Sequence, residues 1–371
     1  MHIGVLKEIK DHEYRVGLTP GSVRELTHKN HVVLVEQAAG VGAGFSDEDY
    51  RLAGANVVAT ADEIFKTVEL IIKVKELQPS ECQKLCEGQV IFTFLHLAPD
   101  LKQAELLLAS GCIAIGCETV TDGEGGLPIL TPMSEIAGRL SIQAGAHCLE
   151  KAQGGAGVLL GRVSGVSSAK VVVIGGGAVG SQAVRVAVGM GAEVVVLDKS
   201  LKRLRELDMY FMGRITTCHA DPFFVEEHVR TADLVVGAVL VPGAFTPKLV
   251  SRSLIHQMRK GSVVVDVSID QGGCLETSHP TTHTNPTYVE HGIIHYCVSN
   301  MPSCVPQTAT LALNHATLPF ILELAEKGCR TACLENPHLL QGLNICRGRV
   351  THPAVALAIQ RPYTPAESAF S

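Results

Sequence analysis

At 371 residues, the chain is long enough for about two domains of ordinary size. Hydrophobic residues make up 46% of the sequence and charged residues 18%, a balance that excludes a disordered chain. The formal net charge of −6 argues against a nucleic-acid-binding protein. The sequence has no tryptophan and only 4% aromatic residues, which argues against a surface that stacks bases.

Twelve cysteines are scattered through the chain, mostly within apolar runs. This distribution favours reduced thiols that act as small core residues rather than a disulfide framework. No apolar segment of a secretory signal follows Met1. The longest weakly polar stretch, residues 304–322, contains two prolines and several polar residues, so it predicts a buried helix rather than a membrane span. We therefore expect a cytoplasmic protein.

In chain order, short β-branched runs alternate with helical patterns, which is typical of a parallel sheet covered by helices. Three helix starts carry capping signals: Thr19 before Pro20, Ser46 with Asp49, and Asp100. The first set of predicted strands comprises residues 2–6, 32–35, 70–74, 90–94 and 112–116.

A loop at 121–132 and a long helix from 134 to about 151 precede a second set of strands. These are predicted at 170–174, 193–197, 234–239, 262–267 and 293–298. From residue 302 the pattern is helical to about 328, and a short helix near 354–359 ends the chain. We predict an α/β fold of two Rossmann-like, doubly wound parallel-sheet domains with a cleft between them. The helices after 305 have no sheet of their own, so we expect them to cover the first domain.

The sharpest motif follows the predicted strand at 170–174. Gly175, Gly177 and Gly180 form a G-x-G-x-x-G pattern that opens a helix. In such a unit Gly175 makes the tight turn, Gly177 lets a pyrophosphate approach the backbone, and Gly180 lets the helix pack on the strand. The positive end of the helix then faces the phosphates. The motif predicts a dinucleotide site.

Asp198 ends the next strand, 18 residues after Gly180. A carboxylate at this position accepts hydrogen bonds from the ribose hydroxyls and repels a 2′-phosphate. The sequence therefore predicts NAD rather than NADP as the cofactor. Without the strand, the helix and this acid, the glycines would indicate only a turn.

Hydride chemistry also needs a substrate anchor and a proton-transfer group, which α/β proteins place on loops after strands. Lys75, His96 and Asp270 follow three predicted strands, and Arg15 lies in a charged loop before a capped helix. Each has a plain alternative when taken alone. Lys75 and Arg15 could be solvated charges, His96 a structural histidine, and Asp270 a turn former beside Gly272 and Gly273.

Taken together, these stretches resemble the alanine dehydrogenase family, whose fold is shared by the NAD-binding subunit of proton-pumping transhydrogenase. The resemblance covers nearly the whole chain and is carried by residues 7–20, 93–99, 132–151, 170–198, 265–273 and 285–319, together with the strand that ends at Lys75. The segments 133–140 and 295–302 are long enough to be specific.

The resemblance implies roles for matching positions. Arg15 and Lys75 would bind the substrate, and His96 and Asp270 would handle protons at the reacting carbon. The NAD site would be lined by Ser134, Ala178, Val179, Asp198, Val239, Leu240, Ile269, Asn300 and Met301, with Arg203 near the adenosine ribose in place of a lysine. It also implies a homohexamer, a discontinuous substrate-binding domain of residues 1–130 plus 306–371, and an NAD-binding Rossmann domain of residues 131–305.

Some members bind magnesium through a glutamate and a histidine. Glu118 matches the first position but Lys327 stands at the second, so no metal site is predicted. The resemblance implies reversible, NAD-dependent conversion of L-alanine to pyruvate and ammonium. Two alternatives remain open: an NAD(H)-binding subunit of a proton-translocating transhydrogenase, and a non-catalytic NAD-binding protein. Retention of Arg15, Lys75 and His96 together favours the enzyme, because a subunit without a small-molecule substrate does not need them.

Overall fold

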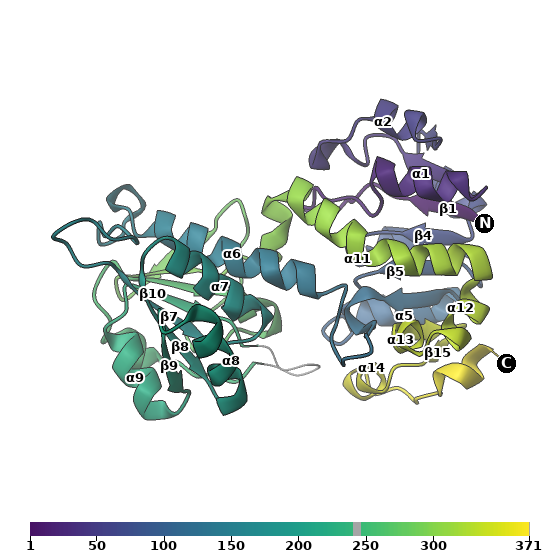
Figure 1. Cartoon of the computed structure of the whole chain (residues 1–371). Helices are drawn as coiled ribbons and strands as arrows, with labels where there is room; N and C mark the ends of the chain where they lie inside the picture. Colours follow the sequence, from purple (N-terminus) through teal and green to yellow (C-terminus); the bar gives the residue numbers. More distant parts are fainter. Residues whose placement is uncertain (240–245, 371) are drawn as a thin grey trace. The chain divides into compact units, whose positions relative to one another are not determined.

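The computed structural model describes residues 1–239 and 246–370 (Figure 1). The chain forms two compact units. Unit 1 comprises Met1–Met133 and Ser303–Ser371, and unit 2 comprises Ser134–Pro302. Unit 1 is therefore discontinuous in sequence, and each unit contains a sheet of its own.

The sheet of unit 1 has eight strands in the order β15-β14-β6-β5-β4-β1-β2-β3. Strands β1 to β6 are parallel to their neighbours, whereas β14 pairs antiparallel with β6 and with β15. The strands are β1 (His2–Val5), β2 (Val32–Glu36), β3 (Asn56–Val58), β4 (Leu70–Ile72), β5 (Val90–Thr93), β6 (Ile113–Gly116), β14 (Leu343–Cys346) and β15 (Arg349–Val350).

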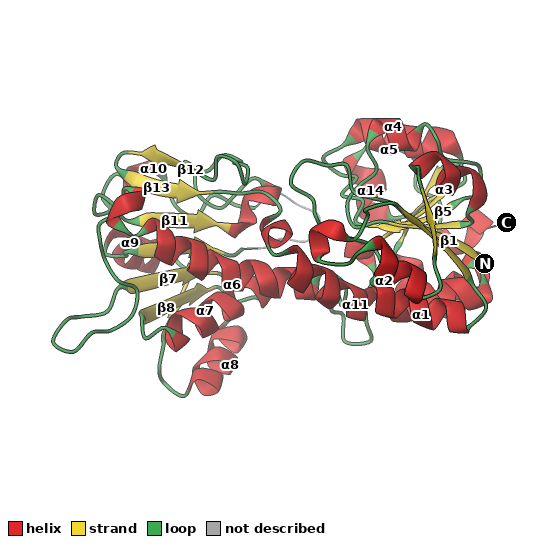
Figure 2. Cartoon of the chain, turned by 90° about the horizontal axis from the view of Figure 1, so that it is seen from above, coloured by secondary structure: helices red, strands yellow, loops and turns green. Residues whose placement is uncertain are grey.

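Helices cover both faces of this sheet (Figure 2). They are α1 (Pro20–His28), α2 (Asp47–Leu52), α3 (Ala61–Thr67), α4 (Pro79–Cys82), α5 (Leu101–Ser110), α11 (Pro306–Lys327), α12 (Cys329–Glu335), α13 (Pro337–Gln341) and α14 (Pro353–Ala358). The three predicted caps are confirmed. The side chains of Thr19, Ser46 and Asp100 each accept a backbone N–H in the first turn of the helix that follows.

The expectation that the C-terminal segment adds only helices was wrong. Strands β14 and β15 extend the sheet of unit 1 beside β6. Strand β14 is buried throughout, so it lacks the alternation that marks a half-exposed strand. The short strands β3, β9 (Thr216–His219) and β12 (Thr287–Glu290) were also not predicted.

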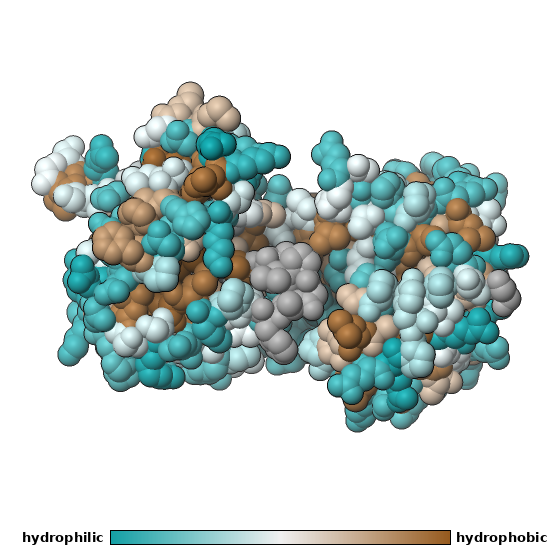
Figure 3. Space-filling view, turned by 90° about the horizontal axis from the view of Figure 1, so that it is seen from below, coloured by the Kyte–Doolittle hydropathy of each residue, from teal (hydrophilic) through white to brown (hydrophobic). Residues whose placement is uncertain are grey.

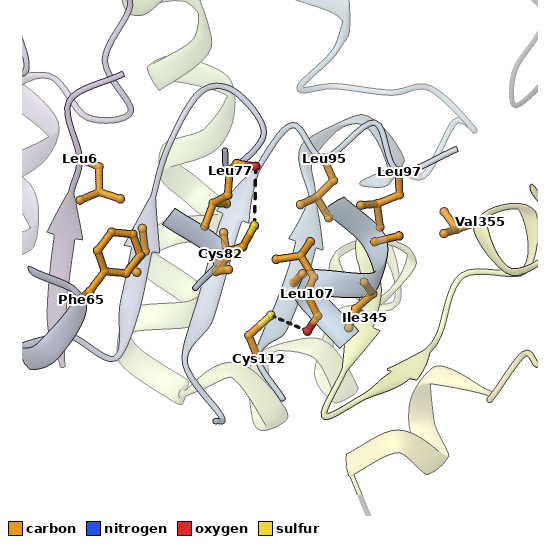
Figure 4. Packing of buried hydrophobic residues seen from close by; sticks show 14 of the residues in the cluster. Leu6, Phe65, Leu77, Cys82, Leu95, Leu97, Leu107, Cys112, Ile345 and Val355 are labelled. Carbon is orange, nitrogen blue, oxygen red and sulfur yellow. Dashed lines mark hydrogen bonds between the residues drawn. The ribbon is translucent and has the colours of Figure 1, made fainter. Parts of the chain in front are cut away.

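The hydrophobic core of unit 1 contains residues from both the N-terminal and the C-terminal segments of the chain. Figure 4 shows Ile345 and Val355, from the C-terminal segment, in the same apolar cluster as Leu95 and Leu107. Burial of this kind stabilises by about 25 cal/mol per Å² of apolar surface removed from water, which accounts for the return of the C-terminal segment to this sheet. All twelve cysteines are free, and burial raises the pKa of the Cys112 thiol to about 11, as expected of an inert core residue.

The sheet of unit 2 has seven strands in the order β12-β13-β11-β10-β7-β8-β9, parallel except for the pair β12/β13. The remaining strands are β7 (Lys170–Ile174), β8 (Glu193–Asp198), β10 (Leu234–Gly237), β11 (Val263–Asp266) and β13 (Ile293–Tyr296). The helices are α6 (Thr131–Cys148), α7 (Ala178–Gly189), α8 (Leu201–Phe211), α9 (Pro222–Arg230) and α10 (Arg252–Ile255), and the unit boundary falls within α6. The two parallel-dominated sheets confirm the predicted fold class.

On the face drawn in Figure 3, polar residues cover much of each unit, and apolar residues form separate patches. Such scattered apolar exposure is ordinary for folded proteins. Among the described residues, no helix is both long and apolar enough to cross a membrane.

Candidate active site

The glycine-rich turn of unit 2 joins β7 to α7. Gly175 has a φ of +100°, a conformation that favours glycine. A methyl group on Gly180 would lie 1.8 Å from the carbonyl oxygen of Gly175, so only glycine allows this approach of helix to turn. A methyl group on Gly177 would meet no atom within 4 Å, which leaves open space beside the backbone there. The residues at this turn therefore fit a dinucleotide pyrophosphate.

The carboxylate of Asp198 lies against the backbone of this turn. Its Oδ2 accepts the backbone N–H of Gly176 at 2.7 Å, and its Oδ1 accepts the backbone N–H of Ser200 at 2.7 Å. The side chain of Arg203 lies alongside, because its Nε donates to the carbonyl oxygen of Gly176 at 2.6 Å. The carboxylate is thus fixed at the carboxyl end of β8, where a ribose is bound in proteins of this fold.

The other predicted cofactor residues are distributed along neighbouring segments of unit 2. Ala178 and Val179 begin α7, Ser134 lies in α6, and Ile269 lies in a short 3-10 helix after β11. Val239 follows β10, and its N–H donates to the Ser268 hydroxyl at 3.0 Å. Asn300, with a φ of +59°, and Met301 follow β13. Leu240 lies outside the described residues.

The loop after β11 carries Asp270 on its surface and is organised by the buried carboxylate of Asp266. Asp266 accepts the backbone N–H groups of Ser268 and Cys274, at 3.1 and 2.9 Å, and the hydroxyl of Ser278 at 2.7 Å. Burial raises the pKa of Asp266, and these hydrogen bonds oppose the rise. Asp270 is exposed, so this side chain is available to a ligand, whereas Asp266 is structural.

In unit 1, Arg15 is held by a carboxylate that the sequence analysis did not single out. The Nε and Nη2 atoms of Arg15 donate to the two carboxylate oxygens of Glu13 at 2.7 and 2.6 Å. Both side chains are almost completely buried. The Nη1 atom lies 3.2 Å from the sulfur of Met133. The paired hydrogen bonds fix the plane of the guanidinium.

Lys75 is positioned by a second unpredicted carboxylate, Glu8. Its Oε1 accepts the backbone N–H groups of Val74 and Lys75 at 2.7 and 3.1 Å. Its Oε2 pairs with the buried Lys73 at 3.0 Å. Burial lowers the pKa of Lys73, but the attraction of Glu8 and a second carboxylate outweighs burial and raises it overall. Lys73 is therefore a buried structural cation, and Lys75, two residues on, is the partly exposed one.

His96 follows β5 in a left-handed backbone conformation, with a φ of +48°. Glu118 stabilises this turn because its carboxylate accepts the backbone N–H of His96 at 2.7 Å and that of Leu95 at 3.1 Å. The imidazole is exposed and stacks parallel to the Phe94 ring, with the ring centroids 5.9 Å apart. The ring is thus presented to solvent while its backbone is fixed.

The structure brings Arg15, Lys75 and His96 to one edge of the unit 1 sheet. Their loops leave the carboxyl ends of β1, β4 and β5, which are adjacent strands. Two contacts tie these loops together: Glu8 holds the backbone at Lys75, and the Thr93 hydroxyl donates to the carbonyl oxygen of Lys75 at 2.9 Å. Apart from Ser134, which lies in α6, the described dinucleotide residues lie at the carboxyl ends of the unit 2 strands, and so does Asp270. This is the edge where ligands of open α/β sheets bind.

Glu118 and Lys327 are both engaged in other contacts. Lys327 pairs with Glu323 and Glu335, at 2.9 Å in each case. Within residues 1–239 and 246–370, no group of three or more His, Cys, Asp or Glu side chains is placed to hold a metal ion.

A Rossmann-type turn with a carboxylate after the second strand defines a dinucleotide-binding protein, and charged groups at the edge of a second sheet are typical of an NAD-dependent dehydrogenase. Comparison with known proteins agrees with this class. Residues 4–137 match the N-terminal domain of alanine dehydrogenase/PNT proteins, and residues 141–353 match the C-terminal domain. The chain therefore belongs to the alanine dehydrogenase/PNT family.

Individual relatives cover almost the full length. An alanine dehydrogenase of Halomonas elongata is 54% identical over 368 residues, which is 99% of each chain. An alanine dehydrogenase of Mycobacterium tuberculosis is 49% identical over 98% of each chain. A solved L-alanine dehydrogenase structure has a TM-score of 0.94 at 50% identity and covers 97% of this chain and 99% of its own. A transhydrogenase from Sinorhizobium meliloti, with a TM-score of 0.82 and 24% identity, shares the fold.

Proposed function

We propose that the chain catalyses reversible, NAD-dependent oxidative deamination of L-alanine to pyruvate and ammonium. The observation that carries the proposal is the set of Arg15, Lys75 and His96 on adjacent loops of one sheet edge. Neighbouring carboxylates hold the guanidinium of Arg15 and the backbones of Lys75 and His96. A pair of cations suits a small carboxylate substrate, and an imidazole whose backbone is held in place suits proton transfer at its α-carbon. Similarity to alanine dehydrogenases over the full chain supports L-alanine as that substrate.

The proposed reaction balances as L-alanine, NAD⁺ and water giving pyruvate, ammonium, NADH and a proton. The α-ammonium group first loses a proton. The α C–H bond then breaks and its electron pair leaves with the hydrogen, while the lone pair of the nitrogen forms the C=N bond of iminopyruvate. Water then adds to the imine carbon, and the carbinolamine expels ammonia as the C=O bond forms. When bound, NAD supplies the ring carbon that accepts the hydride.

The residues of this chain have separate roles in the proposal. Arg15 and Lys75 bind the carboxylate and the carbonyl end of the substrate, and a guanidinium whose fork is already fixed orients the α-carbon. His96 hydrogen-bonds the developing carbinol oxygen and exchanges its proton. Asp270 activates the attacking water or orients the ammonium. A positioned acid or base of this kind is typically worth about 10²–10⁴-fold in rate.

In unit 2, the proposed NAD site comprises the glycine-rich turn, Asp198 and the segments after β10, β11 and β13. We propose Asp198 as the acceptor for the ribose hydroxyls, since its carboxylate is fixed at the end of β8. The assignment of Val239 rests on the family resemblance. It is supported by the hydrogen bond from the Val239 N–H to the Ser268 hydroxyl, at the carboxyl ends of β10 and β11.

A homohexamer in the cytoplasm is also part of the proposal. The hexamer rests on the resemblance of the chain to the alanine dehydrogenase family. A reducing compartment is supported by twelve free cysteines. Sedimentation velocity of the purified chain tests the hexamer, which predicts a mass near six times 39.4 kDa.

The enzyme is tested by following NADH absorbance with a panel of L-amino acids and NAD⁺, and with a panel of 2-oxo acids, ammonium and NADH in reverse. We expect the highest kcat/KM for L-alanine and pyruvate. An NAD(H)-binding subunit of a proton pump would bind NAD and leave every amino acid unchanged. That result would contradict the proposed enzyme activity and favour the transhydrogenase subunit.

A further inference from the structure

A cation lies beside the carboxylate that selects the cofactor. Asp198 accepts the N–H of Gly176, and Arg203 donates to the carbonyl oxygen of the same residue, so both side chains border one peptide. A methyl group placed on Gly176 would lie 3.3 Å from Asp198 Oδ2 and 3.5 Å from Arg203 Cγ, which confirms how close the two are. An arginine in this region commonly binds the 2′-phosphate of NADP. In this chain it stands in a site whose carboxylate favours NAD.

Arg203 forms an ion pair with a second acidic residue. Glu206, one turn along α8, pairs its Oε2 with Arg203 Nη1 at 2.9 Å. The hydrogen bond from Nε to Gly176 holds the other side of the guanidinium. The start of α8 is itself fixed, because the Ser200 hydroxyl accepts the N–H of Arg203. The arginine is thus held by the backbone on one edge and by a carboxylate on the other.

We propose that Glu206 is a second determinant of cofactor choice, acting through Arg203. Asp198 repels a 2′-phosphate directly. Glu206 does so indirectly, because it occupies and neutralises the cation that a 2′-phosphate would otherwise bind. The inference rests on the proposed NAD site at this edge. In this proposal, Glu206 pairs with Arg203 and thereby weakens the binding of 2′-phosphorylated dinucleotides.

The expected size of the effect follows from exposure. The Arg203 and Glu206 side chains are 34% and 43% exposed, so solvent screens their attraction. Removing the Glu206 charge alone should change the affinity for a 2′-phosphorylated ligand by about two- to fivefold, because Asp198 still repels the phosphate. Without Asp198, a phosphate can approach a freed guanidinium and form charge-assisted hydrogen bonds, so the effect of the same substitution should exceed about tenfold.

The test is calorimetric binding of ADP-ribose and of 2′-phospho-ADP-ribose to the full chain, without substrate or turnover. The variants are Glu206→Gln, Asp198→Ser, the pair Asp198→Ser/Glu206→Gln, and this pair with Arg203→Gln added. Asp208→Asn is the matched control, because Asp208 is an exposed carboxylate on the same helix that does not pair with Arg203. The measured quantity is the ratio of the dissociation constant of 2′-phospho-ADP-ribose to that of ADP-ribose. A fall in this ratio means better binding of the 2′-phosphorylated ligand.

The proposal predicts four results. Glu206→Gln shifts the ratio toward the 2′-phosphorylated ligand and Asp208→Asn does not. The shift is larger after Asp198→Ser, and it is lost when Arg203→Gln is added. The gain also falls with rising salt, since it depends on exposed charges.

Two results would overturn it in different ways. If ADP-ribose binds normally but Glu206→Gln leaves the ratio unchanged in both backgrounds, Glu206 has no part in cofactor choice and the NAD site stands. If ADP-ribose does not bind the unsubstituted chain, the proposed nucleotide site itself fails.

Discussion

The carboxylate of Glu118 accepts the backbone N–H of His96 at 2.7 Å while His96 holds a φ of +48°. A non-glycine residue in this region is strained, and such a conformation persists only where neighbouring contacts hold it. Glu118 supplies those contacts from the segment after β6, the strand next to the one that precedes His96. The backbone conformation of His96 therefore sets the direction of the imidazole, and Glu118 is a positioning residue because it holds that backbone.

Replacing Glu118 with alanine should lower kcat by about tenfold or more, because a misplaced catalytic group loses its proton-transfer geometry. Glu118→Gln, which keeps one acceptor oxygen, should retain part of the activity. The affinity for NAD should not change. The measurement is steady-state kinetics with saturating NAD⁺ and varied alanine.

A coupling experiment separates positioning from general stability. In a His96→Ala background, adding Glu118→Ala should cost little more, because Glu118 acts through His96. Losses that multiply in the double variant would mean that Glu118 has a role independent of the imidazole.

Arg15→Lys should raise the KM for pyruvate and lower kcat together. Lysine keeps the charge but cannot form the two parallel hydrogen bonds that fix Arg15 on Glu13. We expect a loss of at least about tenfold in kcat/KM, the size of a lost charge-assisted hydrogen bond. The affinity for NADH in the absence of substrate, measured by fluorescence titration, should be unaffected. An equal loss of nucleotide binding would make Arg15 a structural residue.

His96 and Asp270 should both take part in the proposed reaction, so their effects on kcat should not be independent. His96→Ala and Asp270→Asn should each lower kcat by about 10²-fold or more. The double variant should lose much less than the product of the two single losses. Rates are measured at saturating alanine and NAD⁺, with circular dichroism as the check on folding. A single variant with near-normal turnover would remove that residue from the mechanism.

The buried His295 should make the protein acid-sensitive. Burial lowers its pKa from 6.5 to about 4, opposed by a hydrogen bond between its Nδ1 and the carbonyl oxygen of Ile293 and reinforced by the charges of His279 and Arg252. The unfolded chain therefore takes up a proton first, and stability falls as the pH falls from 6.5 towards 4. At pH 5 the loss from this group is about 2 kcal/mol relative to pH 8.

His295→Gln should lower stability at pH 8, because it disturbs the contact with Thr277, and should flatten the acid side of the stability profile. Urea denaturation at fixed protein concentration from pH 4.5 to 8 measures both effects. Parallel profiles for the two proteins would show that His295 does not titrate in this range on unfolding.

The fold class was predictable because the long apolar runs, such as Lys170–Ile174, and the capped helices carry strong local signals. The missed strands lack such signals. Strand β15 has only two residues, and β14 is recognised as a strand only through its pairing with β6. Short strands of this kind are fixed by tertiary contacts, which a single sequence does not show.

The candidate site was predictable for residues that follow strands or form motifs, such as His96 and Gly175. The carboxylates that hold Arg15 and the backbone of Lys75 were not. Glu8 and Glu13 stand in a charged segment that looks like a solvated loop, and only the structure shows them buried against Lys73 and Arg15. The sequence does carry one signal of this burial. Acidic and basic residues alternate before a capped helix, and such residues can form ion pairs with one another.

The most direct test of the account is the fate of the α-hydrogen of L-alanine. L-[2-²H]alanine is incubated with the chain and NAD⁺, and the NADH and pyruvate are analysed by mass spectrometry. Direct hydride transfer predicts one deuterium in the NADH for each pyruvate formed, with a slower rate than for unlabelled alanine where the transfer limits turnover. NADH without deuterium, or no NADH at all from alanine while ADP-ribose still binds, would contradict it.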